Sequence, residues 1–240
     1  MEYGSSTYGD RWAHRYDDWV AGRWTPAGEV DFLAALAAGG RALELGIGTG
    51  RVAIPLADRG VEVVGIDASE AMLARLREKT DRVHAVAGEM ADVAVDGTFE
   101  LVYCVFNTFF GLLSQADQVR CFAGVAARLA AGGAFVLHVF VPDLTRFDRG
   151  QRLQTKEVEV DELALEASVH DPVRQLVRTQ TVLLGAGEAE LLPVTLRYAW
   201  PSELDLMAQL AGLHLRERFE DFERRPFTPA SGFHVSVYGR

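Results

Sequence analysis

A glycine-rich segment constrains the fold of this 240-residue chain more than any other feature. It follows a short apolar run at residues 42–45 and places Gly46, Gly48 and Gly50 directly before a helical pattern. Glycine lets a ligand approach the backbone closely, and the first amides of a helix lack intrahelical partners. The segment therefore predicts a ligand-binding loop at the carboxyl end of a buried strand in an α/β fold.

An acidic residue after the next strand supports this prediction. Asp67 ends the β-branched run 61–66 and lies 21 residues beyond Gly46. A carboxylate at this position accepts hydrogen bonds from both hydroxyls of a ribose. The structural alternative is that Asp67 only caps the following helix together with Ser69. The joint occurrence of the loop and the acid at this spacing favours the ribose interpretation.

The loop departs from the patterns of two other ligand classes. A dinucleotide fingerprint, G-x-G-x-x-G, requires Gly or Ala where this chain has Arg51. Glu44 would also bring a carboxylate near a pyrophosphate, whereas it suits a ligand with an ammonium or sulfonium group. The Walker pattern is absent. A dinucleotide ligand is therefore the weaker alternative.

Strand and helix patterns alternate from residue 28 to residue 141, which predicts a parallel sheet with helices on both faces. The predicted strands are 42–45, 61–66, 82–87, 101–106 and 134–141. The predicted helices are 28–36, 51–59, one capped by Ser69, and 117–129, the last closed by Gly132 and Gly133.

The remaining residues predict three further parts of a single domain. Residues 1–27 are rich in aromatic side chains and predict an arm that packs on the core, with Trp24 near its end. Residues 142–200 alternate with a period of two and predict an antiparallel meander. Residues 201–240 predict a closing helix and two strands that return to the main sheet. The expected fold is thus α/β and Rossmann-like, a mostly parallel seven-stranded sheet with a meander inserted after the fifth strand.

Composition and charge exclude several function classes. The chain has 24 Lys and Arg against 34 Asp and Glu, a net charge of −10, so neither nucleic acid nor anionic lipid is an expected partner. Its longest uncharged run, 101–116, is too short and too polar for a membrane span, and the N-terminus has no leader pattern. Cys104 and Cys121 lack metal-ligand spacing, so we expect reduced core thiols, no metal site and a cytoplasmic location.

The sequence resembles the class I S-adenosylmethionine-dependent methyltransferases over most of residues 28–141. The resemblance rests on the glycine loop 44–50, Asp67, the segment 88–92 and the fourth strand with its end, 99–107. It implies S-adenosylmethionine as cofactor and S-adenosylhomocysteine as product. The cofactor contacts that it implies are Glu44, Gly46, Gly48, Gly50, Asp67, Ala68, Met72, Glu89, Met90 and Phe106.

The resemblance also assigns individual roles around the expected cofactor. Asp67 would bind the ribose, Glu44 the methionine end, and Glu89, where the family often has Asp, the adenine amino group. Met90 is similar to the apolar residue that covers the adenine face. Tyr16 lies in a Tyr-Asp segment like that of many small-molecule methyltransferases, where the tyrosine closes over the methionine end; an aromatic packing role is the alternative.

Candidate residues for the acceptor lie after the fourth and on the fifth predicted strands. Asn107 and Phe140 are expected to border the reaction crevice, and Phe106-Asn107 is unlike the Asn/Asp-Pro-Pro-aromatic signature of nucleic-acid and protein amide methyltransferases. His138 alternates with Val136 and Phe140 near the carboxyl end of its strand, so it is the best-placed general base, with a hydrogen-bonded core histidine as the alternative.

The meander resembles the antiparallel cover of aminosugar and glycine-type N-methyltransferases, and it predicts either a substrate cover or a homodimer surface. The leading hypothesis is transfer of a methyl group from S-adenosylmethionine to nitrogen or oxygen of a small molecule. The alternatives are an NAD-dependent oxidoreductase or epimerase, and a non-catalytic protein that binds the cofactor.

Overall fold

The computed structural model describes residues 3–21, 27–185, 187 and 189–240. The parts of the predicted arm at residues 1–2 and 22–26, which include Trp24, lie outside the described residues. The helices are α1 Thr7–Trp12, α2 Tyr16–Val20, α3 Ala27–Ala37, α4 Ala53–Ala57, α5 Glu70–Lys79, the 3-10 helix η1 Thr108–Gly111, α6 Gln115–Arg128 and α7 Pro201–Leu210. The strands are β1 Arg41–Leu45, β2 Glu62–Asp67, β3 His84–Ala87, β4 Phe99–Cys104, β5 Leu129–Phe140, β6 Gln151–Val158, β7 Leu163–Asp171, β8 Leu176–Leu184, β9 Glu190–Arg197, β10 His214–Phe219 and β11 Phe233–Gly239.

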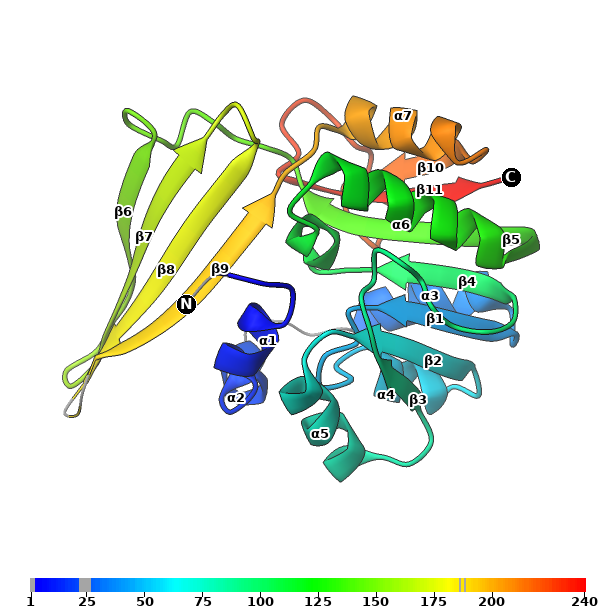
Figure 1. Ribbon diagram of the computed structural model, residues 1–240, viewed down its shortest axis with the longest axis horizontal. Helices are drawn as coiled ribbons and strands as arrows, with labels where there is room; N and C mark the ends of the chain where they lie inside the picture. The colour runs from blue at the N-terminus through cyan, green and yellow to red at the C-terminus, as the bar shows by residue number, and fades with distance from the viewer. Residues whose placement is uncertain (1–2, 22–26, 186, 188) are drawn as a thin grey trace.

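Seven strands form the main sheet in the order β10-β11-β5-β4-β1-β2-β3 (Figure 1). The neighbours from β5 through β3 run parallel, while β11 runs antiparallel to both β5 and β10. The prediction of a mostly parallel sheet closed by a returning strand pair is therefore confirmed. Because the chain order reverses between β1 and β4, ligands are expected at the carboxyl ends of these strands.

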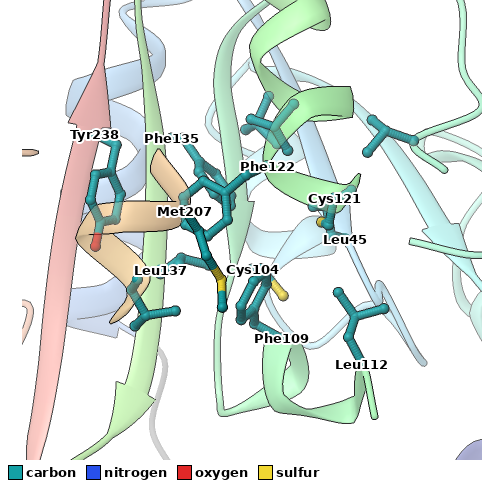
Figure 2. Packing of buried hydrophobic residues seen from close by; sticks show 14 of the residues in the cluster. Leu45, Cys104, Phe109, Leu112, Cys121, Phe122, Phe135, Leu137, Met207 and Tyr238 are labelled. Atoms are coloured by element: carbon teal, nitrogen blue, oxygen red, sulfur yellow. The ribbon is translucent and has the colours of Figure 1, made fainter. Parts of the chain in front are cut away.

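The two faces of the sheet bury separate apolar clusters, since side chains alternate along each strand. Residues such as Leu43 and Leu45 pack with α6 and α7, while Ala42 packs with α3, α4 and α5. In the first cluster the ring of Phe122 meets three aromatic rings edge to face, at 5.3–5.6 Å between centroids (Figure 2). The free thiols of Cys104 and Cys121 are buried there, as the sequence predicts.

The prediction that a glycine pair closes α6 is wrong. The helix ends at Arg128, and β5 begins at the next residue. Its register against β4 shifts between the pairs Phe99↔Leu129 and Leu101↔Ala134, so Gly132 and Gly133 lie in a bulge. Gly132 adopts a φ of +79°, and a Cβ on Gly133 would lie 3.0 Å from the carbonyl oxygen of Glu100. The glycines thus serve strand pairing rather than helix termination.

A second sheet has the order β6-β7-β8-β9 and is entirely antiparallel, which confirms the predicted meander. Figure 1 shows it standing to one side of the main sheet, with β9 nearest to the rest of the molecule. Helix α1 packs against β9 through Trp12 and Leu192, and Met72 of α5 joins this cluster. The arm is therefore wedged between the two sheets.

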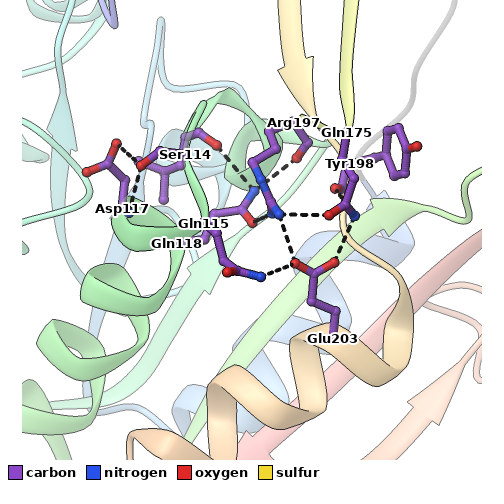
Figure 3. A network of polar contacts seen from close by, with 9 residues as sticks. Ser114, Gln115, Asp117, Gln118, Gln175, Arg197, Tyr198 and Glu203 are labelled. Carbon is purple, nitrogen blue, oxygen red and sulfur yellow. Dashed lines mark hydrogen bonds and ion pairs between the residues drawn. The ribbon is translucent and has the colours of Figure 1, made fainter. Parts of the chain in front are cut away.

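A buried polar network joins the meander to the main body (Figure 3). Arg197 at the end of β9 donates to the side-chain oxygens of Gln118 and Gln175, and it pairs with Glu203 of α7 at 2.9 Å. Gln118 in turn donates to the carbonyl of Leu112, directly after η1, at 3.2 Å. The network connects α6, β9, α7 and Gln175 in the turn before β8 to the segment that follows η1.

None of the helices in the described part of the chain has the length and apolar character needed to cross a membrane.

Candidate active site

The three glycines of the loop between β1 and α4 play different structural parts. Gly46, Gly48 and Gly50 all have positive φ, at +73°, +57° and +83°. A Cβ on Gly46 would lie 2.2 Å from the side chain of Thr108, and one on Gly50 would lie 2.4 Å from Leu76. A Cβ on Gly48 would meet nothing within 4 Å. Gly48 is therefore the position where the loop faces open space, whereas the other two permit tight packing.

Asp67 ends β2 beside this loop. Its two carboxylate oxygens accept hydrogen bonds from the backbone amides of Gly48 and Ser69, each at 2.8 Å. Burial raises the pKa of Asp67, and these amide bonds oppose that rise. Each oxygen retains a lone pair for a further donor, so the carboxylate suits two neighbouring hydroxyls. Ser69 also caps α5 by accepting from the amide of Met72, so the capping alternative describes part of the geometry.

Glu44 lies on the sheet face that carries α3 and α4, and it is only 4 % exposed. The hydroxyl of Tyr103 donates to its Oε2 at 2.9 Å. Burial raises the pKa of Glu44 to about 8, although the Tyr103 hydrogen bond and the charge of Arg51 act in the opposite direction. A buried carboxylate in this state responds strongly to a positively charged ligand, because such a ligand stabilises its ionised form.

Arg51 is a site residue that the sequence reasoning missed, because it served there only as an argument against a dinucleotide. Its guanidinium binds both carboxylate oxygens of Glu29, at 2.9 and 3.4 Å, and lies 5.0 Å from the centre of the Phe106 ring. It also forms a hydrogen bond with the half-buried Tyr16. Glu29 is 3 % exposed on α3, so an acid on the apolar face of a predicted helix was the signal available in the sequence.

Two consecutive residues after β4 hold a strained backbone. Phe106 and Asn107 adopt φ of +59° and +67°, a region that L-residues visit at an energetic cost and that clusters at functional sites. The side-chain oxygen of Asn107 accepts from the backbone amide of Phe140 at 2.7 Å. The backbone amide of Asn107 donates to the carbonyl of His138 at 3.0 Å. These bonds bring Phe106, Asn107, His138 and Phe140 together, as their positions in the sequence suggest.

His138 is 5 % exposed and lies among aromatic rings. Its Nδ1 accepts from the amide of Phe106 at 3.4 Å, and its ring centre lies 4.9 Å from Phe222 and 5.5 Å from Phe233. Burial and the positive charge of Arg51 lower the pKa of His138 to about 4, against a smaller opposing effect of Asp221. The imidazole is consequently neutral across the physiological range.

The N-terminal arm is fastened to the loop and to α5 at two points. The hydroxyl of Ser69 donates to Asp10 at 2.7 Å. The hydroxyl of Thr49 donates to Asp17 at 2.7 Å, and the ammonium of Lys79 pairs with the same carboxylate at 2.7 Å. Thr49 is next to Gly48 and Ser69 is two residues after Asp67, so these bonds hold the arm beside the glycine loop.

The remaining predicted cofactor residues lie around this centre in different settings. Met72 is buried beneath α1, with Gly9 and Trp12 as neighbours. Ala68 is half-buried directly after Asp67, and Met90 is half-buried near Gly111 of η1. Glu89 is exposed and accepts from the hydroxyl of Ser5 at 2.5 Å.

Comparison with known proteins identifies the family. A methyltransferase-domain model matches residues 42–133. The cypemycin N-terminal methyltransferase of a Streptomyces species is 31 % identical over 192 residues, which cover 79 % of this chain and 78 % of that protein. The structure of the CcbJ methyltransferase from Streptomyces caelestis superimposes with a TM-score of 0.92 at 44 % identity, over 98 % of each chain.

A more distant structure shows the same fold with cofactor bound. The S-adenosylmethionine complex of CalS10, an amino pentose methyltransferase from Micromonospora echinaspora, has a TM-score of 0.72 at 24 % identity, covering 92 % of this chain and 95 % of that one. This likeness shows the fold, while the two Streptomyces relatives, both methyltransferases, show the family. This chain belongs to the class I S-adenosylmethionine-dependent methyltransferases.

Proposed function

We propose that this methyltransferase transfers the methyl group of S-adenosylmethionine to an amine of a small molecule, with nitrogen rather than oxygen as the acceptor. The observation that carries the proposal is the setting of His138, on which base-assisted transfer to oxygen would depend: the ring is buried among aromatic side chains, and its Nδ1 already accepts from the amide of Phe106. With a pKa of about 4, its imidazole is a weak base near neutral pH. A hydroxyl acceptor gains about 10² to 10⁴ in rate from a matched base, whereas an amine sheds its proton to water and then needs only alignment.

The acceptor type of one relative supports this proposal. The cypemycin enzyme is named for methylation at an N-terminus. The net charge of −10 disfavours nucleic acid as the acceptor.

The described residues fit S-adenosylmethionine, which when bound supplies a methyl group on a positively charged sulfonium. We assign Asp67 to the ribose hydroxyls because its two oxygens keep acceptor capacity. Glu44 stabilises the positive methionine end by its charge. Gly48 gives the loop its open approach.

We assign Arg51 a positioning role. Its guanidinium contacts the ring of Phe106 and bonds to Tyr16, so it holds two aromatic groups beside the loop. Met90 and Glu89 remain our assignments for the adenine, and Asn107 and Phe140 for the acceptor side.

The proposal is tested by offering the enzyme matched amines and alcohols and measuring formation of S-adenosylhomocysteine. We expect methylation of amines only, with a rate that rises with pH until the amine is deprotonated, and little change in His138→Gln. Methylation of an alcohol that falls at least about 10²-fold in His138→Gln would contradict the proposal and make His138 the base.

We also propose a homodimer formed through the four-stranded sheet. Large apolar side chains are exposed near one end of this sheet, among them Val158 at 69 % and Leu191 at 53 %. Exposed apolar surface of this kind often marks an interaction between chains. Sedimentation at micromolar concentration tests the proposal, and a monomer that retains full turnover would contradict it.

A further inference from the structure

An arginine-lined hollow lies against the four-stranded sheet, apart from the glycine loop. Its volume is about 1180 Å³, and it is bounded by β6–β9, by the segment between β5 and β6, and by Tyr3. Four of its lining residues, Arg146, Arg149, Arg152 and Arg178, are basic. Asp148 is the one acidic side chain among its described lining residues. The hollow is therefore a positively charged region in a chain whose net charge is −10.

The arginines of the hollow have carboxylates in their neighbourhood but form no ion pair with a described one. Among residues 3–21, 27–185, 187 and 189–240, none of the four has a carboxylate oxygen within 4.0 Å. The nearby carboxylate of Glu166 is engaged elsewhere, because it accepts from Gln154 at 2.8 Å and lies 3.4 Å from the ammonium of Lys156. Unpaired guanidinium groups in a concave site provide several directed donors to an incoming anion.

Two of these side chains lie close enough together to affect one another. Burial and the like charge of Arg152 lower the pKa of Arg146, while Glu166 and Asp143 oppose the shift more weakly. The guanidinium of Arg146 also lies 4.9 Å from the centre of the Phe147 ring, which limits its freedom to turn away. The repulsion between two such cations is relieved when an anion lies between them.

A tight turn fixes the backbone at a third arginine that lines the hollow. Asp148 and Gln151 exchange both backbone hydrogen bonds at 2.9 Å, and the two residues between them, Arg149 and Gly150, have φ of +48° and +76°. A non-glycine residue in this region persists only where its surroundings determine it. The turn therefore defines the backbone position from which the exposed Arg149 side chain extends.

We propose that this hollow binds the anionic group of a small organic ligand, a phosphoryl or carboxylate group held by Arg146 and Arg152. Its volume is of the order of known ligand pockets. Arg146 lies on the segment between β5 and β6, which begins directly after Phe140. That the ligand is the methyl acceptor itself rests on the proposed function.

The test is titration calorimetry of the full chain with pyrophosphate and, separately, with citrate. We expect at least one probe to bind with millimolar or tighter affinity that weakens with added salt. The double variant Arg146→Gln, Arg152→Gln should bind at least about tenfold more weakly. Arg174→Gln is the matched control, because Arg174 is exposed on the β7–β8 turn and lies outside the hollow. Tighter pyrophosphate binding identifies a phosphoryl group, and tighter citrate binding a carboxylate.

The proposal is overturned if neither probe binds, or if the double variant binds as tightly as the wild type. It is also overturned if the wild type self-associates, the double variant is monomeric and no probe is taken up, since the arginines then hold a second copy of the chain. Affinity for S-adenosylhomocysteine, measured on the same samples, separates the two proposals. Intact cofactor affinity without anion binding rejects the hollow alone, while absent cofactor binding rejects the proposed function.

Discussion

At the scale of single residues, Asp67 is the most direct test of the cofactor assignment. We expect Asp67→Ala to bind S-adenosylhomocysteine at least about tenfold more weakly, because the ribose hydroxyls lose an ionised acceptor and each such bond contributes about 1.5 to 3 kcal/mol. Calorimetry measures the affinity, and Asp81→Ala, an exposed acid distant from the loop in sequence, is the control. Unchanged affinity in a folded Asp67→Ala protein would reject the ribose role.

Glu44 makes a prediction about stability and pH in the ligand-free protein. Its folded pKa of about 8 lies above the ordinary value of 4.5, so the folded state holds a proton that the unfolded state releases. The stability that the folded state gains from holding this proton is therefore fully present below about pH 4.5 and is lost as the pH rises toward 8. Glu44→Gln keeps an acceptor for Tyr103 but removes the titration.

The measurement for Glu44 is urea unfolding at a series of pH values. Between pH 5 and pH 8 the wild type should lose roughly 2 kcal/mol or more of its free energy of unfolding relative to Glu44→Gln, since one pKa unit corresponds to about 1.4 kcal/mol. Parallel pH profiles for the two proteins would show that Glu44 titrates normally in the folded state.

Some residues of the site could be predicted from the sequence around them, and others could not. The glycine loop and Asp67 were predictable because their spacing follows from a strand, a turn and a helix in immediate succession. The pairing of Arg51 with Glu29, and of Glu44 with Tyr103, depends on which faces of α3, β1 and β4 meet. Such contacts join residues distant in sequence, so no local pattern carries them.

At the scale of elements, the network around Arg197 makes a quantitative prediction. Arg197→Met leaves the side-chain oxygens of Gln118 and Gln175 without their donor. It also removes the positive charge paired with Glu203, whose carboxylate then accepts from the neutral amides of Gln115 and Gln175. We expect a loss of about 3 kcal/mol in the free energy of unfolding. Glu203→Gln in the same background should restore part of it. Additive effects of the two substitutions in a double-mutant cycle would show that the pair is not coupled.

Element types were more predictable than their ends. Every predicted strand of the main sheet and of the meander is present, because period and burial decide them. The predicted helix at 51–59 is shorter, at Ala53–Ala57, and the meander predicted to extend to residue 200 has its last strand, β9, end at Arg197. Tertiary contacts set these limits. The strand β9 ends at Arg197, whose side chain belongs to the polar network, and the glycine pair after α6 lies in the part of β5 that pairs with β4.

At the scale of the whole molecule, ligand binding should raise thermal stability selectively. S-adenosylhomocysteine at about 100 times its Kd stabilises the folded state by about 2.7 kcal/mol. For a chain of this size that corresponds to a rise in Tm of roughly 5 to 10 °C. NAD at the same concentration should leave Tm unchanged. A matching rise with NAD would revive the dinucleotide alternative, and thermal unfolding monitored by circular dichroism measures both.

The arm beside the glycine loop has a consequence for the rate of turnover. The arm is bonded to Ser69 through Asp10 and to Thr49 through Asp17, close to Asp67 and Gly48, and we expect these contacts to open before spent cofactor leaves. Opening of this kind is a slow local event, so departure of product rather than methyl transfer should limit steady cycling. Rapid mixing would then reveal a burst of methylated product in the first cycle. Asp17→Asn weakens the ion pair with Lys79, so it should speed the release of spent cofactor and make the burst smaller.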